Sequence, residues 1–100
     1  MADATASNNK MTDNNVYAYP NPVEPGYTGL ITVVGLSFDA DVKILTSNGK
    51  LVAQGRSNGG TFTWDGKDMQ GKSVASGIYM IATATQKGES GIVSKIAIIR

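Results

Sequence analysis

Residues 41–54, DVKILTSNGKLVAQ, decide the fold class of this chain. Val42 and Ile44 alternate with a lysine between them, which is the period of a half-buried β-strand. An Asn-Gly pair separates this run from a second apolar run, Leu51–Gln54, and that arrangement is the strongest short-range signal for a β-hairpin. Gly49 supplies the positive φ that a tight turn needs. The stretch therefore predicts two antiparallel strands joined by a tight turn.

Short extended runs alternate with turn residues on both sides of this hairpin. No part of the sequence shows the apolar stripe of an amphipathic helix, and the runs recur about every 8–12 residues, the spacing of all-β domains. Strands are predicted over Val16–Tyr19, Thr28–Gly35, Asp41–Thr46, Leu51–Gln54, Thr61–Asp65, Ile78–Thr85 and Ile92–Ile99. Such a series favours an all-β fold, an immunoglobulin-like antiparallel β-sandwich of about seven strands, over a closed barrel.

A small core is predicted around the single tryptophan. Trp64 and Phe62 share one face of their strand, and a large indole among few aromatic residues is the natural centre of a small core. Ile44 and Val33 are expected to join it from neighbouring strands. Tyr79 lies within an alternating strand, so we expect it to pack inward beside the indole.

The first 15 residues, MADATASNNKMTDNN, contain no Val, Ile, Leu or aromatic residue. Such a segment cannot bury enough apolar surface to offset the entropy lost on ordering it. It also lacks the apolar core of a secretory signal peptide. We therefore expect residues 1–15 to be a disordered linker or an appended segment, and residues 16–100 to form one domain.

Composition excludes several classes of function. The chain of 100 residues has neither cysteine nor histidine, so it has no imidazole base, thiolate nucleophile, Cys/His zinc site or disulfide. A formal charge of +1 is too small for a nucleic-acid footprint. No stretch approaches the roughly 20 apolar residues of a membrane span. We expect no catalytic residue, no metal and no cofactor, and hence no enzyme.

One polar cluster, residues 65–72 (DGKDMQGK), allows two interpretations. Asp65, Asp68 and Gln70 offer oxygens of the kind that bind calcium. Their spacing lacks the alternating ligands and terminal glutamate of an EF-hand loop, and two lysines add opposing charge. The favoured interpretation is that the aspartates accept hydrogen bonds from nearby backbone N–H groups and stabilise the turn.

Four short motifs follow one another along the chain: Tyr19-Pro20-Asn21-Pro22, Asn48-Gly49-Lys50, Gly77-Ile78-Tyr79 and Lys95-Ile96. In this order they resemble the C-terminal sorting domains of the type IX (Por) secretion system of Bacteroidetes. Together with Trp64–Asp68 (WDGKD) and residues 71–79 (GKSVASGIY), they are also similar to the immunoglobulin-like domain of flagellar hook-capping proteins. The resemblance runs from about Val16 to Arg100.

The resemblance implies a non-catalytic module that the type IX translocon or its shuttle proteins recognise. The implied recognition uses the two terminal strands, Ile78–Thr85 and Ile92–Arg100, through an exposed edge, Lys95 and the end of the chain. The implied sorting motif comprises Pro20, Asn21, Pro22, Gly49, Gly77, Tyr79, Lys95 and Arg100. The parent protein is expected in the periplasm, at the outer membrane or cell surface, or in the medium. The WDGKD version is more similar to domains that end β-propeller proteins than to typical cargo domains, which implies N-terminal propeller domains in the parent.

The same motifs also have local roles that need no partner. Pro20 and Pro22 are expected to stiffen the exit from a first strand at a sheet edge, and Asn21 to bond the backbone of the turn. Gly77 is expected to allow a bend or a close backbone approach. The shared residues are therefore also compatible with a passive structural immunoglobulin-like module.

Two further surfaces keep other functions open. Ile92–Ile99 carries apolar residues on both faces, although one face suffices in a sandwich. The excess predicts either a partner surface or a neighbouring loop or domain that covers it. Tyr17, Tyr19 and Tyr27 are available for stacking, so an adhesive or sugar-binding module is a further alternative.

Overall fold

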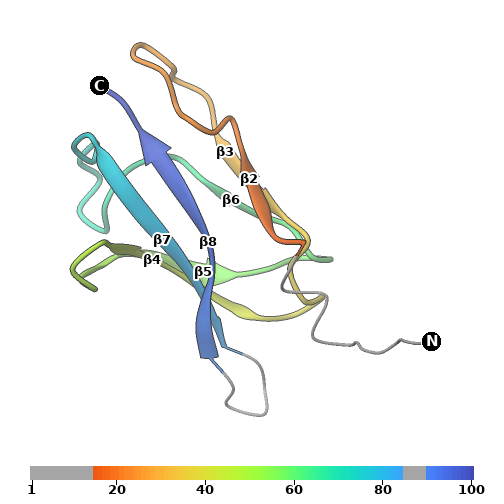
Figure 1. Ribbon diagram of the computed structural model, residues 1–100. Helices are drawn as coiled ribbons and strands as arrows, with labels where there is room; N and C mark the ends of the chain where they lie inside the picture. Colours follow the sequence, from red (N-terminus) through yellow and green to blue (C-terminus); the bar gives the residue numbers. More distant parts are fainter. Residues whose placement is uncertain (1–14, 85–89) are drawn as a thin grey trace.

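Two antiparallel β-sheets form the computed structural model, which describes residues 15–84 and 90–100 (Figure 1). The strands are β2 Tyr17–Tyr19, β3 Ile31–Val34, β4 Asp41–Thr46, β5 Leu51–Arg56, β6 Phe62–Trp64, β7 Gly77–Ala84 and β8 Ser90–Ile98. The all-β sandwich that the sequence predicts is confirmed, with seven strands among the described residues. Residues 1–14 of the expected linker and Thr85 of an expected strand lie outside the described residues.

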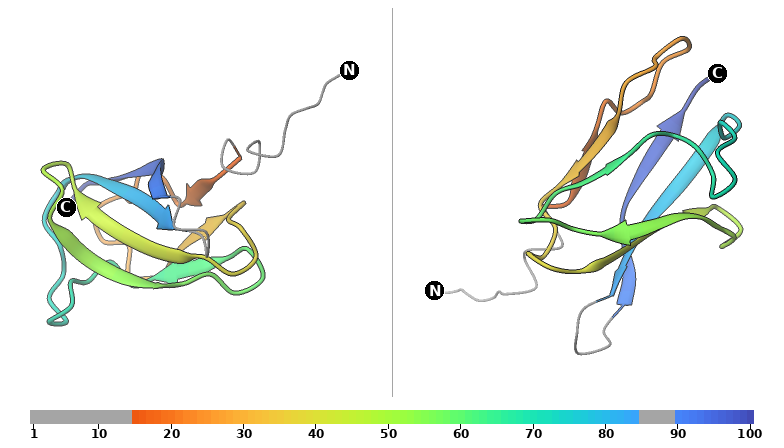
Figure 2. Two further views of the ribbon diagram at one scale, coloured as in Figure 1. Left: turned by 90° about the horizontal axis from the view of Figure 1, so that it is seen from below. Right: turned by 180° about the vertical axis from the view of Figure 1, so that it is seen from behind.

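The sheets contain three and four strands, in the orders β2-β3-β6 and β5-β4-β7-β8 (Figure 2). All neighbouring strands pair antiparallel. The first strand, β2, lies at the edge of its sheet, as the sequence predicts. In the larger sheet β5 and β8 are the edges, whereas β7 lies between β4 and β8. The backbone of β7 is therefore paired on both sides.

The hairpin predicted around Asn-Gly is formed by β4 and β5. Lys43 pairs with Gln54 in its ladder. In the turn, Gly49 has a φ of 90° and its N–H donates to Thr46 O at 2.8 Å. The positive φ predicted for this glycine is thus confirmed, and it lets the chain reverse between two apolar runs.

The strand predicted over Thr28–Gly35 is shorter, since β3 has four residues. Before its start, Tyr27 Oη donates to Leu30 O at 2.7 Å, so a side chain occupies that carbonyl. Just after its end, Gly35 has a φ of 83°, outside the extended region. β3 therefore stops on both sides where the local backbone leaves the ladder.

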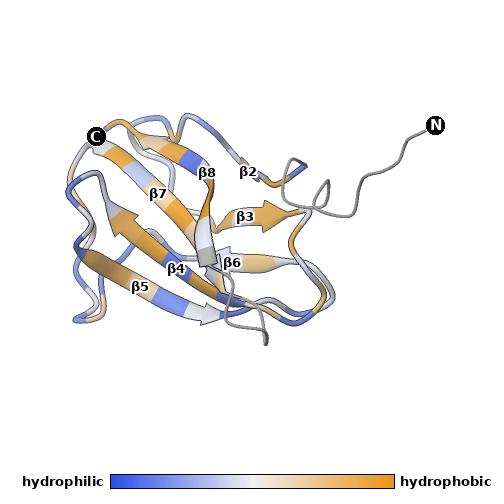
Figure 3. Ribbon diagram, turned by 60° about the horizontal axis from the view of Figure 1, so that its bottom comes forward, coloured by the Kyte–Doolittle hydropathy of each residue, from blue (hydrophilic) through white to orange (hydrophobic). Residues whose placement is uncertain are grey.

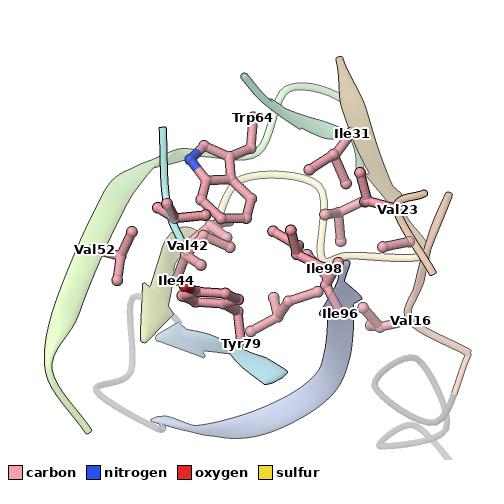
Figure 4. Close-up of a cluster of buried hydrophobic side chains, with 14 of the residues drawn as sticks. Val16, Val23, Ile31, Val42, Ile44, Val52, Trp64, Tyr79, Ile96 and Ile98 are labelled. Atoms are coloured by element: carbon pink, nitrogen blue, oxygen red, sulfur yellow. The ribbon is translucent and has the colours of Figure 1, made fainter. Parts of the chain in front are cut away.

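The core lies between the two sheets and is apolar. Its largest fully buried side chains are Ile31, Val33, Val42, Ile44, Ile81, Ile96 and Ile98. Trp64 and Tyr79, also buried, meet edge to face with ring centroids 5.9 Å apart and an interplanar angle of 61° (Figure 4). Phe62 is only partly buried. Its ring lies on Gly55, where an added Cβ would be 2.6 Å from Phe62 Cε1.

The two faces of β7 give a first prediction. Ile81→Ala lowers the free energy of unfolding by about 2–5 kcal/mol, because Ile81 is fully buried between the sheets. Ile78→Ala, in the same strand but 45% exposed, lowers it by less than about 1 kcal/mol. Urea denaturation of both variants measures the difference. Equal losses would contradict the assignment of these residues to opposite faces.

Candidate recognition site

The segment that follows β2 covers part of the outer edge of β8. Asn21 Nδ2 donates to Lys95 O at 3.1 Å, and Asn21 Oδ1 accepts from Ala97 N at 3.0 Å. Val23 N then donates to Ala97 O, and Val23 O accepts from Ile99 N, both at 2.8 Å. The side-chain amide of Asn21 therefore bonds to β8 as the backbone of a paired strand would, and the backbone of Val23 makes the next two hydrogen bonds along the same edge. We call Pro20–Val23 the edge clip.

The expectation that Asn21 bonds its own turn is wrong. Its two partners are 74 and 76 residues away along the chain. The reason lies in its neighbours, because Pro20 and Pro22 have no backbone N–H to offer to the edge of β8. Both prolines follow cis peptide bonds. The Asn21 side chain supplies the hydrogen bonds to β8 where this backbone has few to give.

The edge clip also corrects the expected mode of recognition. The resemblance implies an exposed edge on the two terminal strands, besides Lys95 and the chain end. β8 is an edge strand, but β7 is internal to its sheet. On β8, the backbone groups of Lys95, Ala97 and Ile99 already bond to the clip. What this part of β8 presents outward is therefore side chains and not free backbone groups.

Arg100 joins the end of β8 to the long loop between β6 and β7. Its N–H donates to Ser76 Oγ at 2.8 Å and its Nε donates to Val74 O at 2.9 Å. A guanidinium N–H also reaches Gly66 O at 3.4 Å. A single arginine thus bonds three points of one loop. This role was missed from sequence, because backbone carbonyl acceptors carry no side-chain signature.

The same loop is bonded from the core by the two central aromatic residues. Trp64 Nε1 donates to Lys67 O at 2.8 Å, and Tyr79 Oη donates to Ala75 O at 2.6 Å. Both rings are buried, so each polar atom needs a partner. The loop supplies those partners as carbonyl oxygens. Its conformation is consequently tied to the centre of the core.

The aspartates of the loop stabilise turns, as the favoured interpretation predicted. Asp65 Oδ1 accepts from Lys67 N at 3.1 Å. Asp68 Oδ1 accepts from Gln70 N at 2.9 Å and from Lys72 N at 3.0 Å. The hydrogen bonds from the backbone of Lys72 and Gln70 hold the pKa of Asp68 below its ordinary value of 3.8.

Two kinds of feature are not found within residues 15–84 and 90–100. This part of the chain contains no group of three or more acidic, histidine or cysteine residues that could hold a metal ion. It also contains no helix long and apolar enough to cross a membrane.

Most of the expected motif residues gather around β8. Gly77 pairs with Ile98, and Tyr79 pairs with Ile96. Asn21 and Arg100 bond to or near the end of the same strand, and the Lys95 side chain is exposed on it. Pro20 and Pro22 flank Asn21 in the clip. Gly49 stands apart in the β4–β5 turn, separated from β8 by β7.

The expectation that Gly77 permits a bend or a close approach is wrong. Its φ is not among the positive values in the chain. A Cβ added to Gly77 would meet only Tyr79 Cε1, at 3.8 Å, which is an ordinary contact. By contrast, a Cβ on Gly35 would collide with the backbone of Asn15 at a φ of 83°. The fold requires glycine at position 35 and not at position 77.

Residues 17–99 match the family model of the secretion system C-terminal sorting domain, and the chain belongs to this family. Its structure is similar to that of PorZ, described as an essential bacterial surface component of the type-IX secretion system of Porphyromonas gingivalis. The identity is 34% and the TM-score 0.75, over 86% of this chain and 12% of that chain. The domain therefore has a role connected with type IX secretion.

A second similar structure is FlgD from P. aeruginosa, with 19% identity and a TM-score of 0.49, over 84% of this chain and 74% of that chain. A comparison with curated proteins gave no match. The resemblance to sorting domains that the ordered motifs indicated is confirmed. Sorting domains are a non-catalytic kind of module, in keeping with the composition.

The edge clip gives a second prediction. Asn21→Ala removes two hydrogen bonds to β8 and lowers the free energy of unfolding by about 1–2 kcal/mol. Asn21→Asp keeps the acceptor for Ala97 N but turns carboxylate lone pairs toward Lys95 O, so it destabilises at least as much. Gln54→Ala is the matched control, since this exposed amide makes no hydrogen bond within the described part of the chain. Equal stability of all three variants would exclude the clip as a structural element.

Asp68 gives a third prediction, on pH dependence. Because folding lowers its pKa, its contribution to stability is complete above about pH 4 and is lost as the pH falls through the folded-state value. Asp68→Asn keeps an acceptor oxygen but does not titrate. Urea unfolding at about pH 6 and about pH 3 should show a smaller loss for this variant than for the wild type. An identical loss in both proteins would contradict the role of the carboxylate.

Proposed function

We propose that this domain is a non-catalytic module that the type IX secretion machinery recognises as a folded unit. Recognition directs its parent protein to the outer membrane or cell surface, or retains it there. The partners are translocon or shuttle proteins of that system. The parent carries further N-terminal domains, a β-propeller among them, which fits the small share of PorZ that this chain matches.

One observation carries this proposal: two of the motif residues are not explained by the fold. Gly77 has room for a side chain and needs no special φ. The Lys95 side chain is exposed and forms no ion pair with any residue that the structure describes. Both lie on the β7–β8 hairpin. A motif residue that the fold does not need is best explained by a partner.

The remaining motif residues have structural roles and support recognition indirectly. Asn21 and Arg100 fix the position of β8, and Tyr79 packs in the core. Their loss would disturb any surface built on β7 and β8. Substitutions of these structural residues would impair a sorting module and a passive structural module alike. The test therefore depends on Gly77 and Lys95.

A second candidate function, saccharide binding, is favoured by one feature. Tyr17 and Tyr19 lie side by side on β2, 57% and 50% exposed, with ring centroids 6.3 Å apart. Paired exposed aromatic rings offer a stacking surface. Tyr27 contributes less, because its hydroxyl is bonded to Leu30 O and its ring lies on Gly29.

A transport assay tests the proposed function. The full 100-residue chain is fused behind a periplasm-directed fluorescent reporter in a Bacteroidetes host, with and without its type IX translocon, and surface and medium fluorescence are measured. We expect export that requires the translocon. Gly77→Ala and Lys95→Ala should each reduce it about tenfold, the effect of losing about 1.4 kcal/mol of binding, without changing the melting temperature.

The controls separate sorting from stability and from saccharide binding. Lys72→Ala removes an exposed lysine outside the β7–β8 hairpin and should be exported normally. Export that survives both Gly77→Ala and Lys95→Ala but fails in Tyr17→Ala would favour a stacking site. A reporter that stays in the periplasm with the wild-type domain folded overturns the proposal. Deleting Lys95–Arg100 is a poor test, because it removes the buried Ile96 and Ile98.

A further inference from the structure

The face of the larger sheet that points away from the core is apolar over much of its width. Strand pairing aligns Leu51, Leu45 and Met80 in one row that ends at Lys95. Ile78 pairs with Ala97 beside that row, and Ile92 pairs with Ala82 on its other side. We call this group of residues the outer apolar face: Leu45, Leu51, Ile78, Met80, Ile92 and Ala97.

This face departs from the usual pattern of a sandwich, whose outer faces are polar. Ile78 and Ile92 are 45% and 53% exposed, although β7 and β8 already bury Ile81 and Ile96 on their inner side. Figure 3 shows β7 and β8 coloured mainly as hydrophobic. A monomer rarely leaves a continuous apolar patch uncovered, and such a patch marks an interaction surface.

The two lysines on this face form no ion pair with any described residue. Lys43 and Lys95 project from β4 and β8, and neither forms an ion pair with a residue in the described ranges. Asp41 is on the same face but bonds Arg56, whose Nη1 lies 2.6 Å from Asp41 Oδ1. Arg56 also bonds Asp39 at 2.9 Å. Lys43 and Lys95 are thus the charged side chains beside the apolar residues that have no ion-pair partner in the described ranges.

A shallow hollow lies at one end of the face. It has a volume of about 230 Å³ and includes Asp41, Lys43, Ala82, Ala84 and Ile92 in its lining. The small alanine side chains leave room there. Asp41 is bonded to Arg56, so Lys43 is the charged residue of the lining that has no ion-pair partner among the described residues. An apolar anchor of a partner can be buried in such a hollow with a carboxylate beside it, as at the centres of tight interfaces.

We propose that the outer apolar face docks onto a protein partner with an apolar centre and a rim of carboxylates. This inference rests on the proposed function, because the partner is then a component of the secretion machinery. Docking through side chains also fits the edge clip, which occupies the backbone edge of β8. Carboxylates opposite Lys43 and Lys95 supply the complementary charge.

Two other occupants fit the face less well. Two lysines give only weak attraction to an anionic membrane, and half-exposed side chains on a flat sheet cannot insert deeply between lipids. A second copy of the chain would bring further lysines without ion-pair partners to the contact, while Asp41 on the same face is already bonded to Arg56. The protein partner therefore agrees best with both the apolar surface and its charge.

Paired variants of the full chain test the face in the transport assay. Ile78→Ser with Ile92→Ser removes apolar surface, and Lys43→Glu with Lys95→Glu reverses the charge. We expect each pair to lower translocon-dependent export at least about tenfold, with melting temperatures lowered no more than in the control pair. The matched control is Leu30→Ser with Met69→Ser, because these residues are 54% and 60% exposed but lie outside the face. Normal export of both face variants overturns the proposal.

A binding assay separates failure of the face from failure of the proposed function. The purified chain is mixed with outer-membrane vesicles that contain or lack the translocon, at about 0.05 M and about 0.5 M NaCl. We expect binding only with the translocon, weakened by salt and lost in both face variants. If wild-type export fails, the proposed function is wrong. The binding assay then still shows whether the outer apolar face binds a protein partner, because it compares the wild type with the face variants.

Two results would assign the face to a different occupant and overturn the protein partner. One is binding to liposomes of equal parts phosphatidylglycerol and phosphatidylethanolamine that the face variants abolish. The other is a concentration-dependent dimer in sedimentation equilibrium that the face variants abolish. Vesicle binding that is the same with and without the translocon also contradicts the proposal.

Discussion

The hydrogen bonds between the edge clip and β8 are the constraint on which the rest of this structure depends. Residues 17–19 form β2, which pairs with β3 in the three-stranded sheet. Val23, four residues after the end of β2, bonds to the edge of β8 in the other sheet. A short segment thus links the two layers along one side of the sandwich. It bonds the outer edge of β8 beside the buried Ile96 and Ile98, while the pairing of β8 with β7 sets which of its side chains point outward. Both the core and the candidate recognition surface follow from that one placement.

The C-terminal end of β8, just beyond the clip, is fixed by a second set of bonds that runs mainly through backbone carbonyls. Arg100, Trp64 and Tyr79 all donate to the loop between β6 and β7. Polar atoms at the edge of the core are thereby satisfied by a loop that has little apolar surface of its own. The loop contributes to stability as an acceptor, which explains why a polar, glycine-rich stretch can have a defined conformation.

Sequence analysis succeeded where the signal is local. The Asn-Gly turn, the alternation in β4 and the turn role of Asp68 depend on residues a few positions apart, and each was predicted. It failed where the partner is a distant backbone atom. Nothing near Asn21 indicates an acceptor on Lys95, and nothing near Arg100 indicates the carbonyl of Val74. The hydrogen-bonding pattern of Asn21 was therefore assigned to its own turn, which is the nearest available backbone.

The clip has a consequence for synthesis of the parent protein. Asn21 finds its partners only when Lys95 and Ala97 have been made, so the sandwich cannot close until nearly the whole module has left the ribosome. A chain broken off before these residues lacks two buried isoleucines of the core as well as the clip contacts. The finished shape of the module thus requires translation of the domain at least as far as Ala97.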